Sequence, residues 1–147
     1  MSNPVDLSEF VFVPRYNIAA AAGHGAYVDS ESYDYCIAFR KDYINQILSS
    51  NTEDFSVITV KGNSMEGVLN HGDLILVNHA RTEPSDGLYV IQIGSDLFVK
   101  QTQRLPNKRL LVKSSNTSYD PFEIDLNDVD ADIRIIGKVE WLGRTIA

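Results

Sequence analysis

Short apolar runs separated by turn residues are the feature that most constrains how this chain can fold. The runs are rich in valine, isoleucine and leucine, and Gly94-Ser95-Asp96 between two of them is typical of a hairpin turn. The predicted strands are Phe55–Val60, Leu74–Val77, Leu88–Ile93, Leu97–Lys100, Leu110–Lys113, Phe122–Leu126 and Ile133–Trp141. Short strands at close spacing predict a mainly β domain, built as a barrel or a sandwich.

The N-terminal part of the chain is less regular. Residues 1–13 are interpreted as a linker or tail, in which a short apolar run is closed by Pro14, and the ordered domain is predicted over residues 14–147. Ala19–Ala22 could suit a helix, but glycines follow at once and no N-cap residue precedes the run, so an extended or mobile segment is predicted.

Two further elements are predicted between this segment and the main run of strands. Tyr35, Ile37 and Phe39 alternate with polar or small residues, which is typical of a strand. Lys41–Leu48 carries apolar residues on one helical face, so the β domain is expected to contain one or two short helices.

Composition limits the classes of protein that remain. A chain of 147 residues fits one domain, and its net charge of −7 argues against gripping DNA by itself, because phosphate contacts need a concentrated basic surface. Cys36 is the only cysteine, so an internal disulfide is excluded. No apolar run is long enough to span a bilayer and no secretory signal is visible, which predicts a cytoplasmic location without membrane partners. Neither a cofactor nor a metal site is predicted.

A serine that follows a strand and a glycine turn is the first candidate for chemistry. Ser64 comes after Gly62-Asn63, where its hydroxyl would be exposed and the backbone N–H groups of Asn63 and Ser64 could converge. Another local interpretation is that Ser64 caps a helical turn running through Leu69.

A serine nucleophile needs a base, and Lys100 is the more interesting candidate. His24, His71 and His79 do not stand in a recognisable triad context. If Val99 faces outward, Lys100 shares an inward face with Phe98, and burial would lower its pKa so that a neutral amine can take the serine proton. The alternative is an edge lysine whose amine stays in water.

Together, these residues belong to a longer pattern that resembles the family of self-cleaving proteins containing LexA, the phage CI repressors and UmuD. The resemblance covers about residues 14–145. It rests on Gly62-Asn63-Ser64-Met65-Glu66, Leu69, Gly72-Asp73, Leu74-Ile75-Leu76-Val77, Gly87, Val90, Phe98-Val99-Lys100, Leu111, Ser115-Asn116, Tyr119-Asp120-Pro121 and Ile136-Gly137-Lys138-Val139.

The resemblance implies a serine endopeptidase that cuts its own chain to relieve repression in the DNA-damage response. Ser64 would attack the Ala22-Gly23 bond, with Lys100 as base and the backbone N–H groups of Asn63 and Ser64 as oxyanion donors; Ala21-Ala22 is the competing bond. It also implies a homodimer, a RecA filament as co-protease, and contact with operator DNA only through an N-terminal helix-turn-helix domain that this sequence does not contain.

Several alternatives stay open. A C-terminal fragment is favoured over a short UmuD-like standalone protein, because the residues before Pro14 resemble a linker. The other functions considered are a catalytically idle dimerisation module of a repressor and a peptidase that acts on other proteins, for which the sequence shows no apolar anchor. The third alternative function is a plain β-barrel binding module, in which Ser64 only caps a helical turn.

Overall fold

The computed structural model describes residues 4–17, 35–47, 54–128 and 131–146. Within these ranges the chain is mainly β with one short α-helix, so the predicted class is confirmed. The elements are a 3-10 turn (Leu7–Glu9), β1 (Phe10–Asn17), β2 (Tyr35–Arg40), α2 (Lys41–Ile47), β3 (Phe55–Thr59), β4 (Leu74–Asn78), β5 (Gly87–Ile93), β6 (Asp96–Leu105), β7 (Arg109–Lys113), β8 (Phe122–Asp125) and β9 (Ile133–Gly143).

Strand β1 corrects the predicted start of the ordered domain. It begins at Phe10, inside the segment interpreted as a linker or tail, and Val13 is buried in the core. The strand continues through Pro14, although proline has no backbone N–H to donate. This is possible because β1 pairs with β3 only from Arg15 onward, so the ladder with β3 needs no donor at Pro14.

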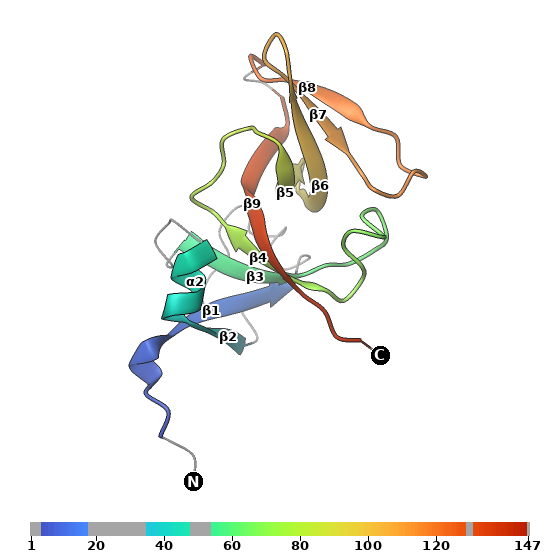
Figure 1. Cartoon of the computed structure of the whole chain (residues 1–147). Helices are drawn as coiled ribbons and strands as arrows, with labels where there is room; N and C mark the ends of the chain where they lie inside the picture. The colour runs from blue at the N-terminus through green and yellow to red at the C-terminus, as the bar shows by residue number, and fades with distance from the viewer. Residues whose placement is uncertain (1–3, 18–34, 48–53, 129–130, 147) are drawn as a thin grey trace.

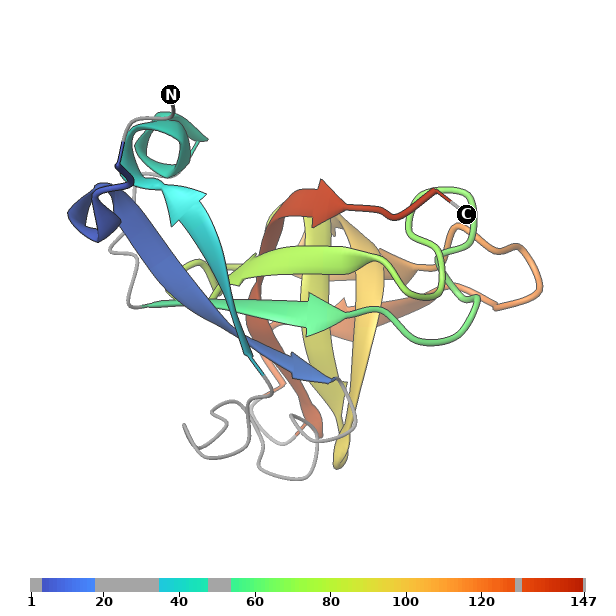
Figure 2. The same cartoon turned by 90° about the horizontal axis from the view of Figure 1, so that it is seen from below.

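The described strands form one sheet in the order β2-β1-β3-β4-β9-β5-β6-β7-β8. The long strand β9 joins its two halves, pairing with β4 through residues 138–143 and with β5 through residues 133–138. Register shifts interrupt both ladders, as expected where a strand bends. Strands β3 and β4 therefore cross β5 and β6 at a steep angle, and the sheet folds over on itself (Figures 1 and 2).

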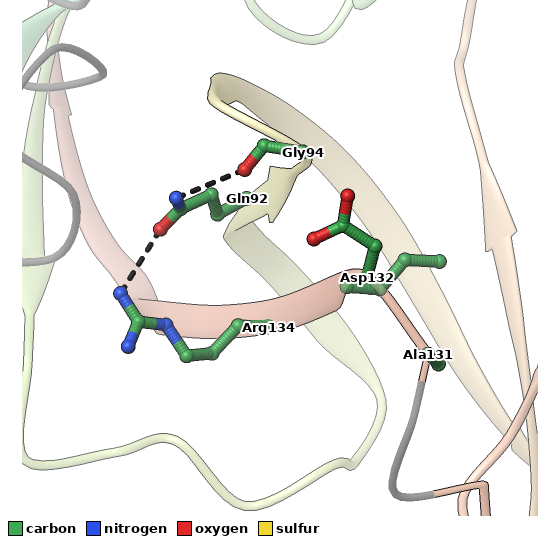
Figure 3. A pocket seen from close by; sticks show the side chains of 6 residues that line it. Gln92, Gly94, Ala131, Asp132 and Arg134 are labelled. Atoms are coloured by element: carbon green, nitrogen blue, oxygen red, sulfur yellow. Dashed lines mark hydrogen bonds between the residues drawn. The ribbon is translucent and has the colours of Figure 1, made fainter.

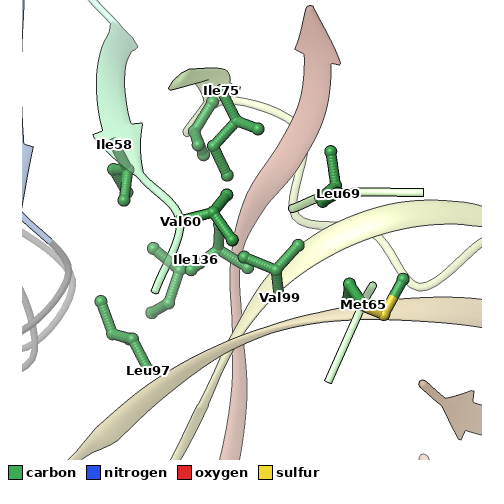
Figure 4. Close-up of a cluster of buried hydrophobic side chains, with 10 residues drawn as sticks. Ile58, Val60, Met65, Leu69, Ile75, Leu97, Val99 and Ile136 are labelled. Carbon is green, nitrogen blue, oxygen red and sulfur yellow. The ribbon is translucent and has the colours of Figure 1, made fainter. Parts of the chain in front are cut away.

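The fold encloses three groups of buried apolar side chains. One lies beneath α2 around Ile44, and another lies between β5, β7 and β8 around Leu110. The third, in Figure 4, joins both halves of the sheet and consists of Ile58, Val60, Met65, Leu69, Ile75, Val77, Val90, Leu97, Val99 and Ile136. Among the described residues, no helix is long and apolar enough to cross a membrane.

Candidate active site

The loop between β3 and β4, residues 61–73, carries Ser64. Its two ends are held together by hydrogen bonds from Val60 N to Asp73 O and from Gly72 N to Val60 O, both 2.8 Å. Met65 and Leu69 anchor the loop in the third core group (Figure 4). The loop is a series of turns, and the one that runs through Leu69 is closed by a hydrogen bond from Leu69 N to Met65 O at 2.7 Å. It can therefore present Ser64 from a backbone fixed on both sides.

The side chain of Ser64 does not act as a helix cap. The amide of Glu66 donates to Asn63 O and that of Gly67 donates to Asn70 Oδ1, so neither reaches the Ser64 hydroxyl. Within the described part of the chain, Ser64 Oγ makes no hydrogen bond. It is half-buried beside a hollow of about 210 Å³ lined by Val60, Lys61, Gly62, Ser64, Met65, Leu97, Phe98 and Val99. The cap interpretation therefore has no support here.

Backbone amides next to Ser64 are also unused. The carbonyls of Asn63 and Ser64 accept hydrogen bonds from Asn116, through its side-chain amide and its backbone N–H, both at 3.0 Å. The N–H groups of Asn63 and Ser64, by contrast, have no acceptor among the residues described. They are therefore able to donate to a developing negative charge.

Lys100 is buried, as the sequence predicts for a base, with 8% of the residue exposed. Its Nζ donates to Ser114 Oγ at 2.8 Å and lies 5.4 Å from the ring centroids of both Phe98 and Tyr119. It makes no ion pair with a carboxylate of the described residues. Burial consequently lowers the pKa of the Lys100 ammonium from its ordinary value of 10.5.

Strand β6 does not meet the condition that Val99 faces outward while Phe98 and Lys100 face inward. Val99 points into the core, whereas Phe98 is 36% exposed. Lys100 is nevertheless buried on the face opposite Val99, because Ser114 and Tyr119 from the β7–β8 connection cover it. An edge lysine with its amine in water is therefore excluded.

Shared neighbours link Lys100 to Ser64. Tyr119 contacts Lys100 through its ring and donates from its hydroxyl to Asn63 Oδ1 at 3.0 Å. Phe98 lines the hollow that also contains Ser64. No hydrogen bond joins Ser64 Oγ to Lys100 Nζ. Phe98 and Tyr119 therefore each connect Lys100 with the part of the chain that carries Ser64.

Arg144 is a residue that the sequence analysis missed. Its guanidinium donates to both carboxylate oxygens of Asp73, from Nε at 2.9 Å and from Nη2 at 2.7 Å. Asp73 Oδ2 also accepts from Asn70 N at 2.7 Å. The Arg144 guanidinium holds the pKa of Asp73 below its ordinary value of 3.8. This buried carboxylate braces the Ser64 loop against the segment after β9.

The described histidines do not contact Ser64. His71 Nδ1 accepts from Gly62 N at 3.1 Å. His79 is hydrogen-bonded to Ser56 Oγ at 2.6 Å and to Ile136 O at 3.2 Å, and burial lowers its pKa. His24 lies outside the described residues, as do Ala22-Gly23 and the competing Ala21-Ala22 bond.

A second hollow, of about 430 Å³, lies away from these groups (Figure 3). Arg134 donates to Gln92 Oε1 there, and Gln92 donates to Gly94 O. Neither Ser64 nor Lys100 lines it. Over the residues that the structure describes, no group of His, Cys, Asp and Glu side chains could hold a metal ion.

Comparison with known proteins places this chain in a family. Residues 14–140 match the family described as Peptidase S24-like. The chain is 32% identical over 136 residues to the 26 kDa repressor protein of Escherichia phage HK022, covering 90% of this chain and 57% of the relative. It is 31% identical over 128 residues to Repressor protein CI of Enterobacteria phage phi80, covering 85% and 52%.

A third relative comes from a bacterium. The LexA repressor of Hahella chejuensis is 39% identical over 83 residues, which is 54% of this chain and 40% of the relative. The chain thus spans about half the length of these curated relatives. With the match covering most of both halves of the sheet, the chain belongs to the Peptidase S24-like family.

Proposed function

We propose that the chain is the self-cleaving, dimer-forming C-terminal domain of a transcriptional repressor, with Ser64 as nucleophile and Lys100 as base. The observation that carries this proposal is the environment of Lys100. Its amine is buried without a carboxylate partner in the described residues, and this burial lowers its pKa. Tyr119, which lies against the amine, is hydrogen-bonded to Asn63, the neighbour of a serine whose hydroxyl makes no hydrogen bond among those residues. A neutral amine in such a place can accept a serine proton.

The proposed reaction uses groups of this chain only. Lys100 Nζ takes the proton of Ser64 Oγ, which attacks the carbonyl carbon of Ala22. The N–H groups of Asn63 and Ser64 stabilise the oxyanion, and the protonated Lys100 then gives its proton to the leaving nitrogen of Gly23. Water hydrolyses the resulting ester. Because the substrate is tethered, its effective concentration depends on loop geometry and not on diffusion.

Repression itself would require more than this domain. The relatives are named as repressors. We propose that this chain forms a homodimer that contacts operator DNA through a separate N-terminal domain, because a dimer can place two reading heads on two half-sites. We further propose that a RecA filament promotes the self-cleavage during DNA damage, by shifting the population of the substrate segment toward the docked state.

Alkaline incubation of the purified chain tests the proposal. Raising the pH deprotonates Lys100, so the chain should split into Met1–Ala22 and Gly23–Ala147, identified by intact mass. Ser64→Ala and Lys100→Met should each abolish the split. Lys41→Met, which removes an exposed lysine at the start of α2, should not. Lack of cleavage at every pH, with and without RecA filaments, would contradict the proposal.

One observation favours a second candidate, a catalytically idle dimerisation module. Lys100 Nζ donates to Ser114 Oγ and not to Ser64 Oγ. An idle module would sediment as a dimer and stay intact in the alkaline experiment, so one sample separates the two candidates.

A further inference from the structure

Ser114 is the residue through which the chain holds the amine of Lys100. Strands β6 and β7 pair antiparallel up to Gln101 and Lys113, so the next residues, Lys100 and Ser114, lie opposite each other. The Ser114 hydroxyl accepts from Lys100 Nζ at 2.8 Å. Of the described residues around this amine, Phe98 and Tyr119 offer ring faces, and Ser114 alone offers a hydrogen bond.

The same connection is attached to the loop of the candidate nucleophile. Ser115 Oγ donates to Glu66 O at 2.9 Å, and Asn116 N donates to Ser64 O at 3.0 Å. The Ser114 hydroxyl is therefore held at a defined position relative to Ser64 as well as to Lys100.

We propose that Ser114 is a positioning residue for self-cleavage, orienting the Lys100 amine toward Ser64; this inference rests on the proposed function. A neutral amine has two N–H groups and one lone pair. Donating one N–H to Ser114 fixes rotation about the Cε–Nζ bond and leaves the lone pair available for the Ser64 proton. The same oxygen also stabilises the ammonium form, which burial otherwise disfavours.

The groups around the amine allow the titration of Lys100 to be followed. Its register partner on β5 is Tyr89, Lys138 lies across Tyr89 on β9, and Tyr119 covers it from the β7–β8 connection. Of these groups, Lys100 is the one whose pKa burial lowers, so its titration is the one to follow.

The test is the pH profile of self-cleavage in matched variants. Ser114→Ala should lower the rate at high pH by at least about tenfold. It should also move the midpoint of the profile to lower pH, because the ammonium loses its acceptor. Ser114→Thr, which keeps a hydroxyl, should restore both. Ser118→Ala is the control from the same connection. It removes an exposed hydroxyl that makes no hydrogen bond among the described residues, so this variant should behave as the parent.

Two results would overturn the inference. One is a Ser114→Ala chain with the parent's rate and midpoint. The other is a slower Ser114→Ala chain whose midpoint is unchanged, which would indicate a structural role only.

A second readout separates this inference from the proposed function. NMR titration of the Lys100 side chain in a Ser64→Ala background needs no cleavage, and Ser114→Ala should lower its midpoint there as well. If the parent never cleaves, the proposed function fails. The effect of Ser114 on Lys100 is then decided by this titration, and an unchanged midpoint would overturn it.

Discussion

Removing the carboxylate of Asp73 should loosen the loop that carries Ser64. The side chain of Asp73 is 3% exposed and accepts three hydrogen bonds, two from Arg144 and one from Asn70 N. In Asp73→Ala the guanidinium of Arg144, which is 38% exposed, can turn into water. The amide of Asn70 has less freedom, because it belongs to the turn that closes the loop.

The size of the effect follows from these contacts. The bond from Asn70 N to a charged acceptor contributes about 1.5–3 kcal/mol. The pair with Arg144 adds little, because the guanidinium is partly hydrated and the pair is screened. We expect Asp73→Ala to lower the free energy of unfolding by about 2–3 kcal/mol. Asp96→Ala, which removes an exposed carboxylate from β6, should change it by less than about 0.5 kcal/mol.

Urea unfolding at several pH values measures this difference. The folded pKa of Asp73 lies below its ordinary value of 3.8, so its stabilising contribution is complete above that value and is lost as the pH falls through the folded pKa. The gap between the parent and Asp73→Ala should therefore be constant near neutral pH and shrink under acid conditions. A gap no larger than that of Asp96→Ala, or one that grows in acid, would refute the reasoning.

Two further predictions concern other parts of the sheet. In Gly137→Ala, the new Cβ would lie 2.7 Å from Val77 Cγ1 and 2.8 Å from the backbone oxygen of Asn78, so unfolding measurements should show a loss of about 1–3 kcal/mol; parental stability would contradict this. Burial lowers the pKa of His79 below its ordinary value of 6.5, so the parent should lose stability as the pH falls below that value, and His79→Gln should lose less; equal loss in both chains would show that another group is responsible.

The strands that the sequence predicts best are those whose apolar residues face the core. Leu74–Val77 and Leu110–Lys113 were predicted nearly to their ends. Strand β6 continues to Leu105, five residues beyond its predicted end, because the ladders with β5 and β7 sustain a polar stretch in which Thr102 is buried. This extension is determined by pairing with the neighbouring strands, and such pairing leaves no apolar pattern in the sequence of β6 itself.

Part of the candidate site could likewise be predicted from the sequence, and part of it could not. Ser64 and Lys100 could be proposed from residue type and spacing, since they lie in recognisable local contexts. The roles of Ser114 and Tyr119 depend on where the β7–β8 connection crosses β6, and the pairing of Arg144 with Asp73 depends on the path of β9. No local pattern encodes those crossings, so these contacts became visible only in the folded chain.

The contact between Asp73 and Arg144 can form only late during synthesis of the chain. The two residues are separated by 71 positions, so the brace on the Ser64 loop cannot form until long after the loop itself has been made. At roughly 5–20 residues per second, the ribosome needs about 4–14 seconds to cover that interval. During that time the nascent chain holds its serine on an unbraced loop, and the loop is secured only after β9 has been translated.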